Sequence, residues 1–87
     1  MIVVFKKFTP EGHERYYKVV VSPNLLGEFL LTREYGNTAY SKPTRVLEKP
    51  FLLLESALEA AEKIIKKRLK NQYRVVFREP KERNILC

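Results

Sequence analysis

Residues 33–37 read REYGN and place a guanidinium, a flat aromatic ring and a carboxamide within one short stretch. The guanidinium of Arg33 suits an anion, the ring of Tyr35 offers an apolar face for stacking, and the amide of Asn37 offers polar contacts. Gly36 lies between them, and glycine adopts positive φ at little cost. We therefore expect a turn directly after Tyr35, which leaves the ring at the rim of a sheet within reach of a ligand. The alternative is that Tyr35 caps the edge of the core and Gly36 is only a hairpin turn residue.

The positive charge of the chain is concentrated near its C-terminal end. Residues 1–62 carry eight basic and eight acidic side chains, whereas residues 63–87 carry nine basic and two acidic ones and hold the whole net charge of +7. A field concentrated in this way attracts polyanions such as nucleic acid, anionic lipid headgroups or acidic proteins. For charge alone, a solvated helix face followed by a charged tail is the alternative interpretation. The cations expected to neutralise a bound polyanion are Lys63, Lys66, Lys67, Lys70 and Arg74.

Residues typical of catalytic, metal or cofactor sites are sparse. His13 is the only histidine and has no cysteine nearby, Cys87 is the only cysteine and occupies the last position, and Glu34 has no second catalytic group beside it in the sequence. The sequence contains no phosphate-binding glycine loop, nucleophile motif or cofactor fingerprint. We therefore expect no enzyme activity, no cofactor, no metal site and no disulfide framework.

The length of 87 residues allows one domain with a modest core. Its content of 45% hydrophobic and 31% charged residues is that of an ordinary globular domain. No apolar run approaches the roughly 20 residues that span a bilayer, and the N-terminal stretch MIVVFKKF is too short for a signal peptide. We expect a single domain over residues 1–87, a cytoplasmic location and no membrane association.

Hydrophobic alternation at a period of two, bounded by proline and glycine, predicts strands over residues 2–8, 15–22, 28–35, 44–49 and 73–78. From Leu54 the period changes to 3.6, which predicts one long helix that ends at residues 71–72. Its apolar stripe is expected to consist of Leu54, Ala57, Leu58, Ala61, Ile64, Ile65 and Leu69. The predicted fold is α+β, with an antiparallel sheet of four to five strands, one long amphipathic helix packed across it, and a flexible tail over residues 80–87.

A family resemblance follows from the order of these features. Residues 15–36 read RYYKVVVSPNLLGEFLLTREYG: an aromatic-rich strand, a proline-containing loop that ends in glycine, and a second strand that leads into aromatic-glycine. The motif KPF at 49–51, the amphipathic helix and the basic run KKRLKNQYR at 66–74 follow. Over residues 15–74 the chain resembles the WGR domain, named for a Trp-Gly-Arg signature. This domain accompanies DNA-dependent poly(ADP-ribose) polymerases and also occurs alone in small bacterial proteins.

The signature itself departs from the family pattern. Tyr35 stands in place of the tryptophan, Gly36 matches, Asn37 replaces the arginine, and Ala39 occupies the position of a further glycine. In DNA-binding members the signature aromatic packs against sugar at a DNA end and the arginine contacts the backbone. Tyr35 keeps a ring face for stacking, but Asn37 has neither the charge nor the fork of donors of an arginine. The resemblance therefore implies the fold more strongly than it implies recognition of DNA ends.

The function expected from the resemblance and the charge is that of a small, non-enzymatic module that binds nucleic acid, with DNA favoured over RNA. Tyr35 is the expected stacking group, which Tyr40 in the following loop can extend, and Arg33 and Asn37 are the expected polar contacts. The alternative is a protein-interaction module that has lost DNA binding. Such a module can add the strand over residues 73–78 to a partner, or pair this strand with a second copy of itself.

Overall fold

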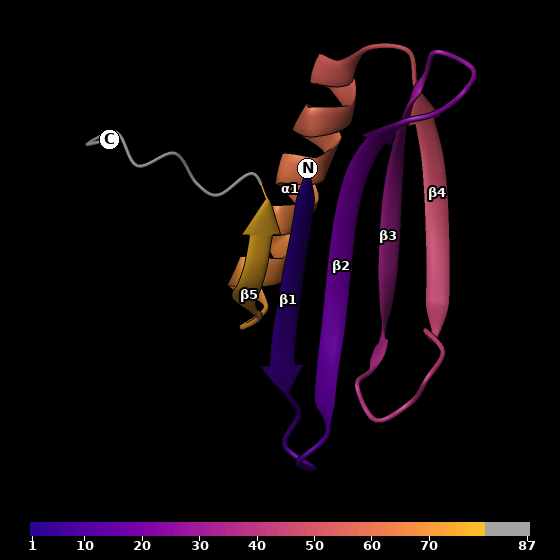
Figure 1. The fold of residues 1–87 in the computed structure, drawn as a ribbon. Helices are drawn as coiled ribbons and strands as arrows, with labels where there is room; N and C mark the ends of the chain where they lie inside the picture. The colour runs from indigo at the N-terminus through magenta and orange to yellow at the C-terminus, as the bar shows by residue number, and fades with distance from the viewer. Residues whose placement is uncertain (80–87) are drawn as a thin grey trace.

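The backbone of residues 1–79, the part of the chain that this computed structural model describes, forms one antiparallel sheet with one helix across one of its faces (Figure 1). The predicted α+β fold is confirmed. The elements are β1 (Ile2–Phe8), β2 (Glu14–Pro23), β3 (Phe29–Asn37), β4 (Arg45–Phe51), α1 (Leu54–Lys70) and β5 (Arg74–Glu79). In the sheet they follow the order β4-β3-β2-β1-β5, so β4 and β5 form its two edges. The tail predicted over residues 80–87 lies outside the described residues.

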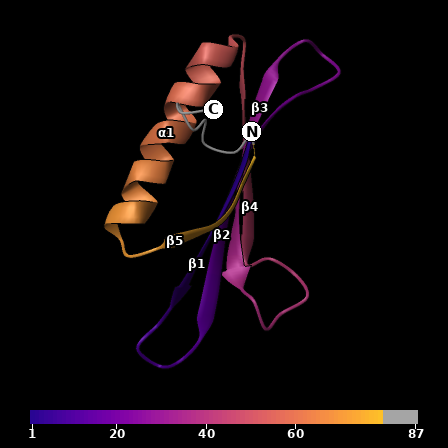
Figure 2. The same cartoon turned by 60° about the vertical axis from the view of Figure 1, so that its left-hand side comes forward.

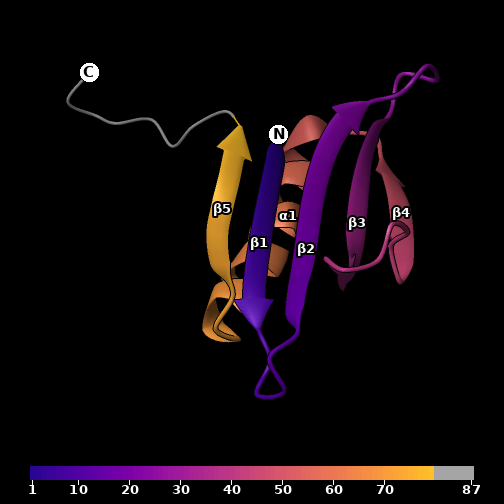
Figure 3. The ribbon, with the colours of Figure 1, turned by 60° about the horizontal axis from the view of Figure 1, so that its bottom comes forward.

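The core lies between the sheet and α1, which covers one sheet face (Figures 2 and 3). Alternate residues of the three central strands point into it, because successive side chains of a strand face opposite sides. The buried residues of the strands and of the helix are Val3, Phe5, Tyr17, Val19, Val21, Leu31, Ala57, Ala61 and Ile65. The small alanines of α1 allow its backbone to approach the sheet closely. Within residues 1–79 no helix combines the length and the apolar character that crossing a bilayer requires.

Helix α1 runs from Leu54 to Lys70, as its period predicts, and its acidic first turn and basic last turn suit the helix dipole. It ends where the backbone N–H of Asn71 donates to the carbonyls of Lys67 and Arg68, and Gln72 takes a φ of 74° that redirects the chain into β5. The predicted stripe is wrong at its two ends, Leu54 and Leu69, which are 44% and 49% exposed. Since an α-helix turns by about 100° per residue, the buried line through Ala61 and Ile65 continues to Arg68 instead.

The turn predicted after Tyr35 is wrong, because β3 continues through Gly36 to Asn37 and Gly36 does not have positive φ. Glycine is needed here for a different reason. Gly36 is buried under the segment that returns to β4, and a Cβ at this position would lie 2.8 Å from the backbone nitrogen of Thr44. That same nitrogen donates a hydrogen bond to the carbonyl oxygen of Tyr35 at 2.9 Å. Gly36 therefore lets the β3–β4 connection pack directly on the strand.

On the sheet face opposite α1, a hydrogen bond joins the side chains of Tyr16 and Glu34, and its contribution to stability depends on pH. Tyr16 Oη donates to Glu34 Oε2 at 2.9 Å, and burial, followed by the nearby Glu34 carboxylate, raises the Tyr16 pKa above its ordinary value of 10.0. Below pH 10 both the folded and the unfolded chain keep this proton. Above pH 10 the unfolded state loses it first, so this contribution to stability falls as the pH rises through the raised pKa.

Replacing Tyr16 with phenylalanine is expected to lower the free energy of unfolding by about 1 kcal/mol near pH 7, because the hydrogen bond is lost. The difference between the two proteins should shrink above pH 10, where the natural protein loses the same contribution. Urea unfolding followed by circular dichroism at pH 7 to 11 measures both. A difference that stays constant across this range would contradict the assignment.

Candidate nucleic-acid interface

Two tyrosines form a stacked pair on the sheet face that α1 covers. Tyr17 of β2 and Tyr35 of β3 are direct cross-strand neighbours, so their side chains project to the same face. Their ring centroids are 5.4 Å apart and their planes differ by 6°. Tyr73, which precedes β5, meets Tyr17 edge-on at 6.2 Å and Phe5 edge-on at 6.4 Å. The four rings thus form a continuous row that begins in the buried core at Phe5 and ends at the partly buried Tyr35.

Arg68 of α1 lies against this aromatic row. Its guanidinium carbon is 4.6 Å from the centroid of the Tyr17 ring and 5.7 Å from that of Tyr73. Cation–π contacts of this kind hold a guanidinium flat against a ring and restrict its motion. Arg68 Nε is buried and has no hydrogen-bond partner among the described residues. A buried donor without a partner is costly, so the fold leaves this one nitrogen of the guanidinium incompletely paired.

A hollow of about 390 Å³ lies beside the stacked tyrosines. We call it the arginine–tyrosine hollow, and its lining residues are Arg15, Tyr17, Arg33, Tyr35, Leu47, Arg68 and Tyr73. Three arginines, from β2, β3 and α1, line the hollow, and among residues 1–79 no carboxylate does. The ion pairs found within residues 1–79 join Glu14 to Lys6 and to Arg74, so they leave these three arginines unpaired. The hollow is therefore electropositive and carries rigid aromatic faces.

The end of the sheet adds further cations around this hollow. Arg45 of β4 is exposed and lies directly opposite Tyr35, so it shares the same face of the sheet. Lys7 of β1 places its amine 5.3 Å from the Tyr73 ring centroid and donates to the Asn71 carbonyl oxygen at 2.8 Å. Figure 2 shows that this end of the sheet extends beyond the C-terminal end of α1, where the helix no longer covers it.

Of the residues expected from sequence to bind, Arg33 and Tyr35 come together in the hollow. Tyr35 is partly buried and packs against the core, and the turn at Gly36 that both interpretations of its position assumed is not formed. Asn37 ends β3 opposite Arg15, beside the hollow. Its Oδ1 accepts a hydrogen bond from the backbone N–H of Ala39 at 2.8 Å, so its side-chain oxygen is committed to the local turn.

The basic residues of the C-terminal half are placed differently. None of the four expected helix lysines, Lys63, Lys66, Lys67 and Lys70, lines the arginine–tyrosine hollow, and all four are exposed. Arg74 lies opposite Lys6 in the sheet, stacks on the Phe8 ring at 5.5 Å and approaches Glu14 to 3.6 Å, which places it on the other face of the sheet. Helix α1 and Tyr35 do lie on the same side of the sheet, and Arg68 is the helix residue that joins them.

Arg15, Tyr17 and Arg68 line the hollow but were not among the residues expected from the sequence, although the sequence contains a signal for them. Arg68 follows Ala61 and Ile65 on the buried stripe, and a charged residue on such a stripe must meet a specific partner. Arg15 and Tyr17 precede Val19 and Val21 at a period of two, which puts all four on the core face. Which guanidinium meets which ring depends on the strand register, and the order of residues alone does not fix it.

The arginines and stacked tyrosines of the hollow are groups that can bind anions and flat ring systems. Residues 1–79 contain no group of three or more His, Cys, Asp and Glu side chains placed to hold a metal ion. No curated protein and no solved structure matches the chain significantly. A family model described as the WGR domain matches residues 2–80, almost the whole chain. The chain therefore belongs to the WGR domain family, whose members are generally nucleic-acid-binding modules.

Proposed function

We propose that this protein binds nucleic acid, with DNA favoured over RNA, through the arginine–tyrosine hollow and the basic residues around it. The observation that carries the proposal is that three arginines line a hollow beside a stacked tyrosine pair, with no carboxylate among the lining residues that residues 1–79 supply. Guanidiniums bind phosphate oxygens with two parallel hydrogen bonds, and aromatic faces stack on sugars and bases. The family to which the chain belongs supports the same proposal.

In this proposal the residues have different roles. Tyr35 stacks on a sugar or base, while Arg33 and Arg68 bind the adjacent phosphates as positioned groups. Asn37, with its oxygen held in the turn, contributes only its amide N–H groups. The exposed lysines of α1 act through their field and neutralise backbone charge at longer range. Arg74 on the opposite face contributes to the overall charge but makes no contact within the hollow.

The salt dependence of binding tests the proposal. We expect labelled DNA to bind with log affinity falling against log salt at a slope of about −4 to −5, which corresponds to roughly four to six neutralised phosphates. Fluorescence anisotropy at about 50 and about 200 mM salt covers the range over which such binding weakens most visibly. Duplexes with and without a 5′ phosphate, a single strand and the matching RNA reveal the preferred form.

The aromatic contribution is tested in the same assay with Tyr35→Ala, which is expected to weaken binding by roughly 5- to 150-fold, the value of one lost stacking interaction. Tyr16→Phe is the matched control, because this tyrosine faces the other side of the sheet and should leave binding unchanged. A flat salt dependence, or no binding at about 50 mM salt, would contradict the proposal.

A second candidate, a protein-interaction module, is favoured by the edge strand β5. Its residues Val75, Val76 and Phe77 are each between 41% and 49% exposed, and among residues 1–79 β5 pairs only with β1. An exposed, apolar edge strand is a ready template for pairing with another chain. This candidate requires a dimer, or a complex with a partner, that multi-angle light scattering detects; a strict monomer that binds DNA as described above favours the first proposal.

A further inference from the structure

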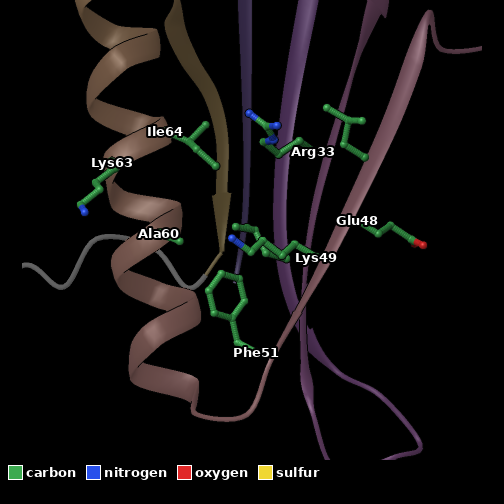
Figure 4. Close-up of a pocket in the computed structure, with 9 residues that line it drawn as sticks. Arg33, Glu48, Lys49, Phe51, Ala60, Lys63 and Ile64 are labelled. Atoms are coloured by element: carbon green, nitrogen blue, oxygen red, sulfur yellow. The ribbon is translucent and has the colours of Figure 1, made fainter.

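A second hollow lies between α1 and the strands β3 and β4 and is separate from the stacked tyrosines. It has a volume of about 460 Å³. Leu31, Leu47 and Phe51 from the strands and Ala60 and Ile64 from the helix form its apolar floor. Figure 4 shows Ile64 and Ala60 facing the strands across this space, with the Phe51 ring below them. We call this feature the apolar groove.

The rim of the apolar groove is cationic. Lys49 of β4 holds its amine 5.3 Å from the centroid of the Phe51 ring, and Arg33 closes the end nearest the arginine–tyrosine hollow. Figure 4 shows the Lys49 side chain reaching across the groove, whereas the Glu48 carboxylate and the Lys63 amine point away from it. Neither Arg33 nor Lys49 belongs to an ion pair found within residues 1–79. The charges that face the groove are therefore positive and unneutralised.

The apolar surface does not stop at the groove. Leu52, Leu53 and Leu54 follow Phe51 directly, at the junction of β4 and α1, and are 77%, 64% and 44% exposed. Isolated exposed leucines are common in proteins, but three in succession, next in the sequence to a residue of the apolar floor, give this junction an exposed apolar patch of the kind that marks interaction sites. A surface that combines such a patch with unpaired cations is complementary to a segment that is both apolar and acidic.

We propose that the apolar groove binds an acidic segment of a partner protein, which inserts one large apolar side chain onto the floor and places flanking carboxylates beside Lys49 and Arg33. A second copy of this chain fits poorly, because each copy carries a net charge of +7 and the two would repel one another. A nucleobase also fits poorly, since its polar edges would face leucine, isoleucine and phenylalanine side chains without hydrogen-bond partners. Charge complementarity and the apolar floor together favour the acidic protein segment.

The apolar groove adjoins the arginine–tyrosine hollow, so an acidic segment bound in the groove affects binding in the hollow. Arg33 and Leu47 line both. A carboxylate paired with Arg33 in the groove withdraws this guanidinium from a phosphate in the hollow, so the acidic segment and nucleic acid compete. Binding of the acidic segment itself does not depend on the proposed nucleic-acid function, and it is tested without nucleic acid.

The test uses short fluorescein-labelled peptides of aspartate and glutamate around one central leucine, isoleucine, phenylalanine or methionine. At least one of them is expected to bind about tenfold or more tightly than the same peptide with a central serine, since burying a large apolar side chain contributes this much or more. A serine-centred peptide that binds equally well would show that charge alone is responsible and would overturn the proposal. Failure of the whole panel to bind at about 50 mM salt would overturn it as well.

Two variants locate the binding site. Ala60→Phe fills the groove without changing any charge, and Lys49→Glu reverses the charge on its rim; each is expected to weaken peptide binding about tenfold or more. Lys42→Glu is the matched control, because it makes the same charge change at an exposed position that lines neither hollow. Circular dichroism confirms that each variant is folded. Variants that bind like the natural protein, or peptide binding that Arg68→Ala abolishes and Ala60→Phe leaves intact, would overturn the assignment.

The same variants separate this inference from the nucleic-acid proposal. Ala60→Phe should keep DNA binding while it loses peptide binding. Adding the tightest peptide to the natural protein should displace labelled DNA, and adding it to Ala60→Phe should not. If DNA does not bind at all, the peptide measurements still decide whether the apolar groove is occupied.

Discussion

Replacing Phe5 with alanine is expected to lower the free energy of unfolding by about 3 to 5 kcal/mol. Phe5 is fully buried in the core and is the largest side chain so completely enclosed within residues 1–79. Its removal forfeits the burial of an aromatic ring and leaves a cavity that the surrounding β-sheet fills only in part. For a domain of this size such a loss is a large fraction of the total stability. Urea unfolding followed by circular dichroism measures it.

Phe8→Ala is the matched control for this prediction. Phe8 lies on the same strand as Phe5 but is 59% exposed, so its replacement is expected to change stability by less than about 1 kcal/mol. Two variants with equal losses would show that the core does not centre on Phe5. Because Phe5 supports the edge of Tyr73, which in turn contacts Tyr17, Phe5→Ala should also loosen the tyrosines that line the hollow.

Much of the fold was predictable because its local signals agree with one another. The strand over residues 2–8 and the start of the helix at Leu54 are found where the sequence predicts them, and β3 and β4 differ from the predictions by one or two residues at their ends. In each case alternation or helical periodicity, flanked by turn residues, marks a single buried face. Agreement between local preference and tertiary packing is what allows a short sequence to be interpreted in this way.

Gly36 shows why part of the candidate site was not predictable. Glycine serves both positive φ and close backbone approach, and only the position of Thr44 in space decides which of the two applies. A glycine at position 36 indicates that a side chain is not tolerated there. The sequence does not indicate which part of the chain lies against this position. The prediction that the Tyr35 ring is accessible rested on a turn at Gly36, and β3 has no turn at this position. The ring reaches the hollow because the strand register stacks it on Tyr17.

The positive charge shows a second limit of the sequence. Net charge by segment directs attention to the lysine-rich end of α1, yet the three arginines that line the hollow come from β2, β3 and α1, and two of them lie in residues 1–62, where the charges cancel. Charge density along a chain predicts long-range attraction, whereas a binding site depends on which few charges meet in space. Arg15, Arg33 and Arg68 meet only after the sheet forms and the helix packs on it.

Arg68→Ala is expected to weaken DNA binding by about 10- to 150-fold, the loss that follows when a charge-assisted hydrogen bond of roughly 1.5 to 3 kcal/mol is removed. The effect should exceed that of any single exposed lysine, because contacts with two rings hold this guanidinium in place before the ligand arrives. A group held in position loses little conformational freedom on binding. Anisotropy at about 50 mM salt measures the loss.

Lys66→Ala and Arg68→Lys are the controls that separate position from charge. Lys66 is exposed on the same helix and lines neither hollow, so its loss should lower the salt slope by about one and the affinity only modestly. Arg68→Lys keeps the charge but removes the planar fork that stacks on the tyrosines, and it is expected to behave more like the alanine variant than like the natural protein. If Arg68→Lys retains full affinity, or if Lys66→Ala costs as much as Arg68→Ala, then the diffuse field of the helix drives binding and the arrangement around Tyr17 does not.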